Sequence, residues 1–327
     1  MNRRGASSDG RPRIAVVGAV TVDGSHLRAA LVKHGVPGAR VDLYGTTEGE
    51  VVLSDYGGEA RMIQEPDLED LARHELIFLC EHADAALADA VPGSVIIDLH
   101  GASPAQVSPL GLAPHEVARD AKCFAVPHPM ALVLAEVLHP LHRELGLAEA
   151  TAVVIRPASD FGRKGVEELR DQAVCLLSFS QVPVTTFGRQ LAFNIVPDAL
   201  LPVGQRGLES RINREVADLL GWADSHFAVK LLAAAVFYGH GLQLHFRLAR
   251  DASLEEVRSV LEHDGLLRPS TAEAAATPLD VTDEMRTSLS ELAEDGMGAY
   301  WLWGVAGETA ANVAQRAVRL AATLFDL

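Results

Sequence analysis

This chain of 327 residues contains only three cysteines, and their spacing argues against a domain held together by disulfides or by zinc. The three cysteines, Cys80, Cys123 and Cys175, form no CxxC pair. An odd number of widely spaced cysteines argues against a disulfide framework, and zinc-ligand spacing is absent as well. Aromatic residues make up only 5% of the sequence, so alanine, valine and leucine must supply most of the core.

Positive charge is also in deficit, because 28 lysines and arginines face 44 aspartates and glutamates, for a net charge of −16. A field of this sign repels phosphate backbones and anionic lipid, which argues against nucleic-acid binding and against a membrane-surface role. The polar N-terminus lacks the apolar segment of a signal peptide, and no later run approaches the roughly 18 apolar residues of a membrane span. We therefore expect a cytoplasmic protein.

The first part of the chain alternates short apolar strands with helices. Strands are predicted at Arg13–Val17, Val41–Tyr44, Leu76–Cys80 and Ser94–Leu99, and helices at Ser25–His34 and Ala83–Ala90. Repeated strand–helix–strand units of this kind are typical of a Rossmann-like, doubly wound parallel sheet. With 48% hydrophobic residues and this length, two domains are expected.

The pattern changes after Pro127. A long apolar helix is predicted at Met130–Leu145, and strands at Ala152–Arg156, Phe227–Phe237 and Gly241–Leu248. The last of these alternates apolar and polar residues, as an antiparallel strand with one covered face does. With helices at Gly165–Ser178 and Ser210–Leu220 and a loop at Arg268–Pro278, these strands indicate a mixed α+β second domain. A final alanine-rich helix is predicted at Glu308–Leu324.

A degenerate glycine loop follows the first strand, in the strand–turn–helix context of dinucleotide binding. Gly18 and Gly24 can fill the first and third glycine positions of such loops, with Ala19 beside them, but the middle position is Thr21. The Thr21 side chain narrows the space for phosphate, and Asp23 puts negative charge where an anion should bind. An ordinary tight turn is the competing interpretation.

No residue stands out as a nucleophile or a metal ligand. The three cysteines lie in apolar strands or helices without a cationic neighbour to lower the thiol pKa, and Glu81 beside Cys80 would raise it. His240, between two glycines at a strand end, can face a cleft. A histidine whose ring is satisfied by hydrogen bonds within a turn is the simpler interpretation. His240 and His245 fall on opposite faces of one strand, which excludes a shared metal.

Several segments together resemble the aspartate-semialdehyde dehydrogenase family over nearly the whole chain. RIAVVGAVTVDG is similar to its opening strand and turn, AVPHPMA to its nucleophile loop, and VFYGHG to the loop with its catalytic histidine. TFGRQLAFNIVP and AAVFYGH most resemble the Usg-type paralogues, which lack the active cysteine. The resemblance implies a tail at 1–12, a Rossmann-like NADP-binding-type domain at 13–127 plus 305–327, and an α+β dimerisation or substrate-type domain at 128–304.

The chemistry of the family does not carry over with the resemblance. The nucleophilic cysteine falls on Pro129, which cannot form the acyl-thioester that this mechanism requires. The histidine is kept as His240, but the arginine two residues before it is Tyr238. The helix arginine that clamps a carboxylate falls on Ala217, so a bidentate clamp is missing from both places. Only vestigial catalytic positions are left.

The cofactor side is altered too. The small residues that face phosphate in the family are replaced by Cys80, Glu81 and His82, and the polar pair that begins the last helix by Gly307 and Glu308. Gly18, Ala19 and Gly24 remain as a degenerate cofactor loop. The resemblance therefore implies that NADP binds weakly or not at all.

The leading hypothesis is a catalytically inactive homologue with a structural or regulatory role, which forms a homodimer or a mixed dimer with an active paralogue. Trp301 and Trp303, at alternate positions of one strand, either line that interface or belong to the core of their own domain. One alternative is an active NADP-dependent semialdehyde dehydrogenase with a rearranged site that uses Cys123. The other is a metabolite sensor that binds a ligand near His240 without turnover.

Overall fold

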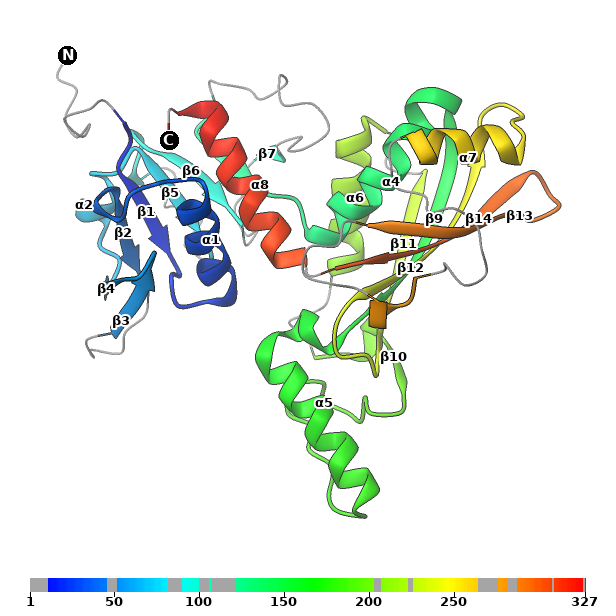
Figure 1. The fold of residues 1–327 in the computed structure, drawn as a ribbon, viewed down its shortest axis with the longest axis horizontal. Helices are drawn as coiled ribbons and strands as arrows, with labels where there is room; N and C mark the ends of the chain where they lie inside the picture. Colours follow the sequence, from blue (N-terminus) through cyan, green and yellow to red (C-terminus); the bar gives the residue numbers. More distant parts are fainter. Residues whose placement is uncertain are drawn as a thin grey trace. The chain divides into compact units, whose positions relative to one another are not determined.

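The fold consists of two compact units (Figure 1). The computed structural model describes residues 11–45, 52–81, 90–99, 106–107, 121–202, 207–222, 226–263, 276–280, 287–307, 309–325 and 327. Unit 1 comprises Met1–Pro129 and Thr309–Leu327, and unit 2 comprises Met130–Glu308. The sequence predicts domain boundaries at 127/128 and 304/305, and these two units meet at 129/130 and 308/309. Residues 1–10 of the expected tail, 83–89 of one expected helix and 268–275 of the expected loop lie outside the described residues.

Unit 1 is built on a sheet with the strand order β3-β4-β2-β1-β5-β6-β8-β7. Every neighbouring pair is parallel except the hairpin β3–β4. The strands are β1 (Ile14–Val17), β2 (Val41–Tyr44), β3 (Val52–Tyr56), β4 (Glu59–Gln64), β5 (Leu76–Leu79), β6 (Val95–Asp98), β7 (Gln106–Val107) and β8 (Cys123–Ala125). All four residues of β1 and of β5 are buried, as parallel strands covered on both faces require. The doubly wound sheet expected from the sequence is confirmed.

The helices of unit 1 are α1 (Val22–Lys33), α2 (Leu68–Leu71) and α8 (Thr309–Leu324), with the short 3-10 helix η1 (Gly38–Arg40). Helices α1 and α8 lie side by side although nearly the whole chain separates them (Figure 1). The C-terminal helix therefore belongs to the first unit. Helix α1 begins three residues before the predicted start at Ser25, because the side chain of Thr21 caps it.

Unit 2 is built on a mixed sheet with the strand order β10-β11-β9-β12-β14-β13. Only β11 and β9 are parallel, and the other neighbours are antiparallel. The strands are β9 (Leu147–Arg156), β10 (Ile195–Pro197), β11 (Phe227–Ala234), β12 (His240–Leu248), β13 (Ser288–Glu294) and β14 (Ala299–Ala306). The predicted antiparallel strand at Gly241–Leu248 is thus β12, with one additional residue at its start.

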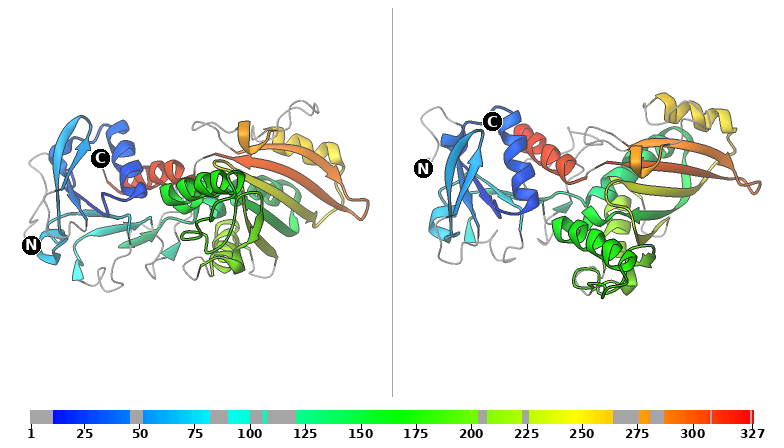
Figure 2. Two further views of the ribbon diagram at one scale, coloured as in Figure 1. Left: turned by 90° about the horizontal axis from the view of Figure 1, so that it is seen from below. Right: turned by 60° about the horizontal axis from the view of Figure 1, so that its bottom comes forward.

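The helices of unit 2 are α4 (Pro129–Leu145), α5 (Gly162–Leu177), α6 (Leu208–Leu220) and α7 (Leu254–His263). Three short 3-10 helices join them: η3 (Ala158–Phe161), η4 (Asp198–Leu200) and η6 (Pro278–Asp280). Helices α4, α6 and α7 lie together along the sheet, and α5 projects away from them (Figures 1 and 2). The edge of β11 is closed by α6, whose Asn213 and Glu209 accept hydrogen bonds from the backbone of Val229 and Leu231.

One predicted strand is shorter than the sequence indicates. The prediction of Phe227–Phe237 is wrong at its end, because β11 stops at Ala234. The carbonyls of Val236 and Phe237 accept hydrogen bonds from Ala158 and Ser159 instead of from a neighbouring strand. The apolar run therefore continues past the strand into a turn that leads to His240.

Candidate functional site

The glycine turn lies at the carboxyl edge of the first sheet, where ligands of doubly wound domains bind. Gly18 adopts φ +82°, and its N–H and that of Ala19 both donate to the carbonyl of Tyr44 at 2.9 Å. A Cβ added to Gly24 would lie 2.2 Å from the carbonyl oxygen of Gly18. Both glycines are therefore required by the close approach of helix α1 to strand β1, whether or not a ligand binds.

Thr21 uses the start of helix α1 for an internal contact. Its Oγ accepts a hydrogen bond from the N–H of Gly24 at 3.0 Å. The same hydroxyl lies 2.8 Å from the carbonyl oxygen of Gly18 and 3.2 Å from that of Cys80, to which it can donate. A backbone N–H that could hold an anion at this helix start is thus occupied by the cap.

Acidic side chains lie near this turn among the residues that the structure describes. A Cβ added to Gly18 would lie 2.9 Å from both the Cβ and the Cγ of Glu81, so the Glu81 side chain already lies against the glycine. Burial raises the pKa of the Cys80 thiol well above its ordinary value, and the nearby carboxylates of Asp23, Asp98 and Glu81 raise it further. The described residues of this edge do not fit the diphosphate of a dinucleotide. His82 and Glu308 lie outside the described residues, and Gly307 is buried.

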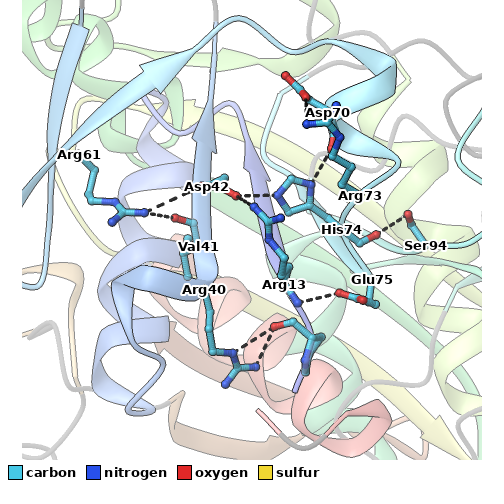
Figure 3. Close-up of polar contacts among 11 residues, drawn as sticks. Arg13, Arg40, Val41, Asp42, Arg61, Asp70, Arg73, His74, Glu75 and Ser94 are labelled. Carbon is cyan, nitrogen blue, oxygen red and sulfur yellow. Dashed lines mark hydrogen bonds and ion pairs between the residues drawn. The ribbon is translucent and has the colours of Figure 1, made fainter. Parts of the chain in front are cut away.

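A polar cluster lies at the opposite, amino edge of the same sheet (Figure 3). Asp42, at the second position of β2, accepts a hydrogen bond from Nη2 of Arg13 at 2.8 Å and one from Nε2 of His74 at 2.9 Å. Nδ1 of His74 lies 3.0 Å from the carbonyl of Asp70, and the hydroxyl of Ser94 donates to the carbonyl of His74. These contacts join the starts of β1, β2, β5 and β6, which indicates a structural role.

The positions to which the resemblance assigns the nucleophile and the clamps hold uncharged residues. Pro129 is the first residue of α4, a position that suits proline because no N–H is needed there. Ala217 is buried within α6, and Tyr238 is 55% exposed in the turn before β12. Ala217 lies in α6, whereas Tyr238 lies two residues before His240, the first residue of β12.

His240 belongs to a buried charged cluster that the sequence alone did not reveal. Its Nε2 lies 3.4 Å from Oδ1 of Asp160, and neither ring nitrogen has a hydrogen-bond partner. Asp160 also pairs with Arg156, whose guanidinium binds Asp198 as well and lies 4.5 Å from the ring centre of Phe161. Burial raises the pKa of Asp198, while Arg156 opposes this shift. The guanidinium is thus already held by two carboxylates.

The described residues contain no grouping of three or more histidine, cysteine or acidic side chains that could hold a metal ion. His240 and His245 do lie on opposite faces of β12, as predicted, since one is buried and the other is half-buried. In the part of the chain that the structure describes, no helix has the length and apolarity to cross a membrane.

Three comparisons identify relatives. A family profile described as "Semialdehyde dehydrogenase, dimerisation domain" matches residues 138–307. The USG-1 protein homolog of Pseudomonas aeruginosa is 29% identical over 260 residues, which cover 76% of this chain and 77% of that protein. The aspartate-semialdehyde dehydrogenase of Rickettsia bellii is 27% identical over 208 residues, or 61% of each chain. The crystal structure of aspartate semialdehyde dehydrogenase II from Vibrio cholerae has a TM-score of 0.80 at 20% identity, covering 96% of this chain and 98% of that one.

The fold defines a class of two-domain α/β proteins that join a dinucleotide-binding-type sheet to a mixed dimerisation-type sheet. Within that class, the chain belongs to the aspartate-semialdehyde dehydrogenase family, and it is similar to the USG-1 proteins. The resemblance identified in the sequence is therefore confirmed.

Proposed function

We propose that this chain is a non-catalytic member of its family that acts as a structural or regulatory dimer. The observation that carries the proposal is Pro129, which stands where the resemblance places the nucleophilic cysteine and begins helix α4. Its ring has no atom that can attack an aldehyde, so the covalent intermediate of the family cannot form there. The chain keeps the scaffold without this chemistry.

The surroundings of the vestigial site support the same proposal. Ala217 and Tyr238 supply no cation, and the guanidinium of Arg156 is already paired with Asp160 and Asp198. Oriented charge–charge contacts are what hold an anionic substrate for reaction, and their loss costs several kcal/mol of barrier lowering. Where the phosphates of NADP would lie, the Glu81 side chain lies against Gly18 and Thr21 caps the start of helix α1.

For a chain without turnover, the formation of a dimer is the function that we propose. More than half of it matches a dimerisation domain, and a two-fold homodimer is the commonest closed assembly. We propose a homodimer formed by unit 2, with a mixed dimer between this chain and a catalytically complete paralogue as the regulatory form.

The test of the proposed function is a steady-state assay of aspartate-semialdehyde oxidation with NADP and phosphate. We expect no turnover above background. Turnover that is lost in Cys123→Ser would contradict the proposal and identify a rearranged enzyme, in which Cys123 at the start of β8 supplies the thiol. The replacement exchanges one sulfur atom for oxygen in a side chain of nearly the same shape, so a loss of activity would report on the thiol itself.

Restoring the thiol provides a second test. We expect Pro129→Cys alone to stay inactive by orders of magnitude, because a thiol without positioned cations lacks the orientation that covalent catalysis needs. Activity in this single revertant, compared with a Pro129→Ser control, would mean that the clamps lie elsewhere in the chain.

A further inference from the structure

The carboxylate of Asp160 lies between two buried basic side chains of unit 2. One of its oxygens, Oδ2, accepts a hydrogen bond from Nε of Arg156, and the other, Oδ1, lies 3.4 Å from Nε2 of His240. Arg156 is the last residue of β9 and His240 the first of β12. They are neighbours because the antiparallel register pairs the adjacent residues Ile155 and Gly241.

Arg156 and His240 together have the donors of an anion site. A guanidinium and an imidazole both donate hydrogen bonds to carboxylate oxygens, and charge-assisted bonds of this kind are stronger than neutral ones. Both side chains are buried, and a buried guanidinium without an acceptor destabilises a fold. These two residues therefore need an anion beside them, and the chain supplies it as Asp160.

Asp160 is the member of this cluster that lies nearest to solvent. Its side chain is 15% exposed, compared with 3% for Arg156, 4% for His240 and 5% for Asp198. A carboxylate that approached Arg156 and His240 from solvent would therefore have to take the place of the Asp160 carboxylate.

The backbone of η3 holds Asp160 in this position. The N–H groups of Ala158 and Ser159 donate to the carbonyls of Val236 and Phe237, at 2.7 and 3.0 Å, and so join η3 to the turn that leads to His240. On the other side, a Cβ added to Gly165 of α5 would lie 2.4 Å from the carbonyl oxygen of Ala158. The Asp160 carboxylate is thus positioned by the main chain as well as by its contact with Arg156.

Charge also opposes a further anion at this place. Arg156 binds Asp198 in addition to Asp160, so two carboxylates face one guanidinium. The pKa of Asp198 is raised, first by burial and then by the negative charges of Glu209 and Asp160, whereas Arg156 lowers it. A third carboxylate would add to this repulsion.

His240 keeps hydrogen-bonding capacity that the described residues do not use. Its side chain is buried, and no described residue forms a hydrogen bond with either ring nitrogen. Buried polar atoms in a structural network are normally satisfied, so this ring is unusual for a residue that serves packing alone. Its Nε2 faces Asp160, which indicates a donor directed at the position of that carboxylate.

We infer that Asp160 is a built-in occupant of an anion site formed by Arg156 and His240, and that its carboxylate closes this site to carboxylate ligands. The inference deepens the proposed function and rests on it, because it gives a reason why no anionic substrate is held beside His240. The ligand class of the site is the small monocarboxylate, the group that Asp160 itself presents.

The test is to remove the internal carboxylate and offer an external one. Asp160→Ala leaves a space that formate, which is the same carboxylate group without the chain, can fill. We expect the Tm of this variant to be higher in about 100 mM sodium formate than in sodium chloride at the same concentration. At ten times the dissociation constant of formate, the difference should be about 2 °C or more. The unaltered chain should melt at the same temperature in both salts.

Three further variants separate the anion site from general effects of salt and of lost packing. Asp160→Asn fills the space without a charge and should show no difference between the salts. Asp171→Ala removes an exposed carboxylate that pairs with Arg170, and it should show none either. Combining Asp160→Ala with His240→Ala should at least halve the formate effect, because one of the two donors is gone.

A folded Asp160→Ala variant with equal Tm values in both salts would overturn the inference, and so would an equal formate effect in the unaltered chain. A full formate effect in the double variant would remove His240 from the site. If Asp160→Ala does not fold in chloride, refolding followed by circular dichroism decides: a native spectrum in formate alone supports the inference, and recovery in neither salt contradicts it. Turnover in the dehydrogenase assay would overturn the proposed function, whereas the formate result is read without any activity.

Discussion

Cys80 shows how the neighbours of one residue decide its chemistry. It follows β5, is 2% exposed, and burial together with the carboxylates of Asp23, Asp98 and Glu81 raises its thiol pKa. Only the thiolate reacts as a nucleophile, so the raised pKa and the burial both lower the reactivity of this thiol. At the residue scale, this cysteine is part of the core, as the sequence predicts.

We therefore expect the native protein to react unevenly with a thiol reagent at pH 8. Cys123 and Cys175, which are half-buried, should be modified first, and Cys80 only after denaturation. Mass spectrometry of labelled peptides measures each site separately. Labelling of Cys80 at the rate of Cys175 would contradict the burial of the carboxyl edge.

At the scale of elements, the cluster around Asp42 joins four strand starts. The pKa of the Asp42 carboxyl is lowered, mainly by the hydrogen bond from His74 and also by that from Arg13, although burial acts in the opposite direction. A carboxylate whose pKa is lowered by folding contributes its full stabilisation at pH values above its pKa in the unfolded chain, which is about 3.9. That contribution is lost as the pH falls from there through the lower folded pKa.

Asp42→Asn should accordingly lower the free energy of unfolding at pH 7 by about 1–2 kcal/mol, a modest value because Arg13 is partly exposed. Urea unfolding monitored by circular dichroism measures the difference, which should shrink below pH 4. Asp70→Asn, which removes an exposed pair with Arg73, should change stability by less than about 0.5 kcal/mol. Equal losses in both variants would mean that the cluster does not hold the strands together.

Local sequence signals predict some elements of this chain better than others. The buried strands β1, β5 and β6 are continuous apolar runs, and they were predicted within one residue at each end. Helix α7 was not predicted, although Ser253 and Glu256 form a reciprocal capping box before it. The β3–β4 hairpin was also missed, although Gly57 and Gly58 supply the positive φ angles of its turn.

The buried cluster at His240 could not be predicted in the same way. Arg156 and Asp198 are 42 residues apart, and only the folded sheet and the two 3-10 helices bring them together. Asp160 follows Arg156 by four residues, across the turn from β9 into η3, and this short spacing is the only local signal of the cluster. Sequence patterns report neighbours along an element, whereas this contact depends on tertiary packing.

At the scale of the whole molecule, the chain combines the two-unit scaffold of its family with altered residues at several positions that the resemblance assigns to chemistry. Pro129, Ala217 and Tyr238 fall in three separate segments, and Thr21 and Glu81 in two more. A single difference could be compensated by a neighbour. Changes of this kind in several segments are what we expect when selection acts on the fold and its surfaces.

We predict that this scaffold does not bind the dinucleotide, and isothermal titration of NADP into the full chain tests this prediction most directly. We expect only the heat of dilution up to hundreds of micromolar NADP, because Glu81 lies against Gly18 and Thr21 caps helix α1. A saturable heat with a dissociation constant in the low micromolar range would contradict it. Such binding would also raise the free energy of unfolding by about 2.7 kcal/mol at 100 times the dissociation constant, which a thermal melt would show as a higher Tm.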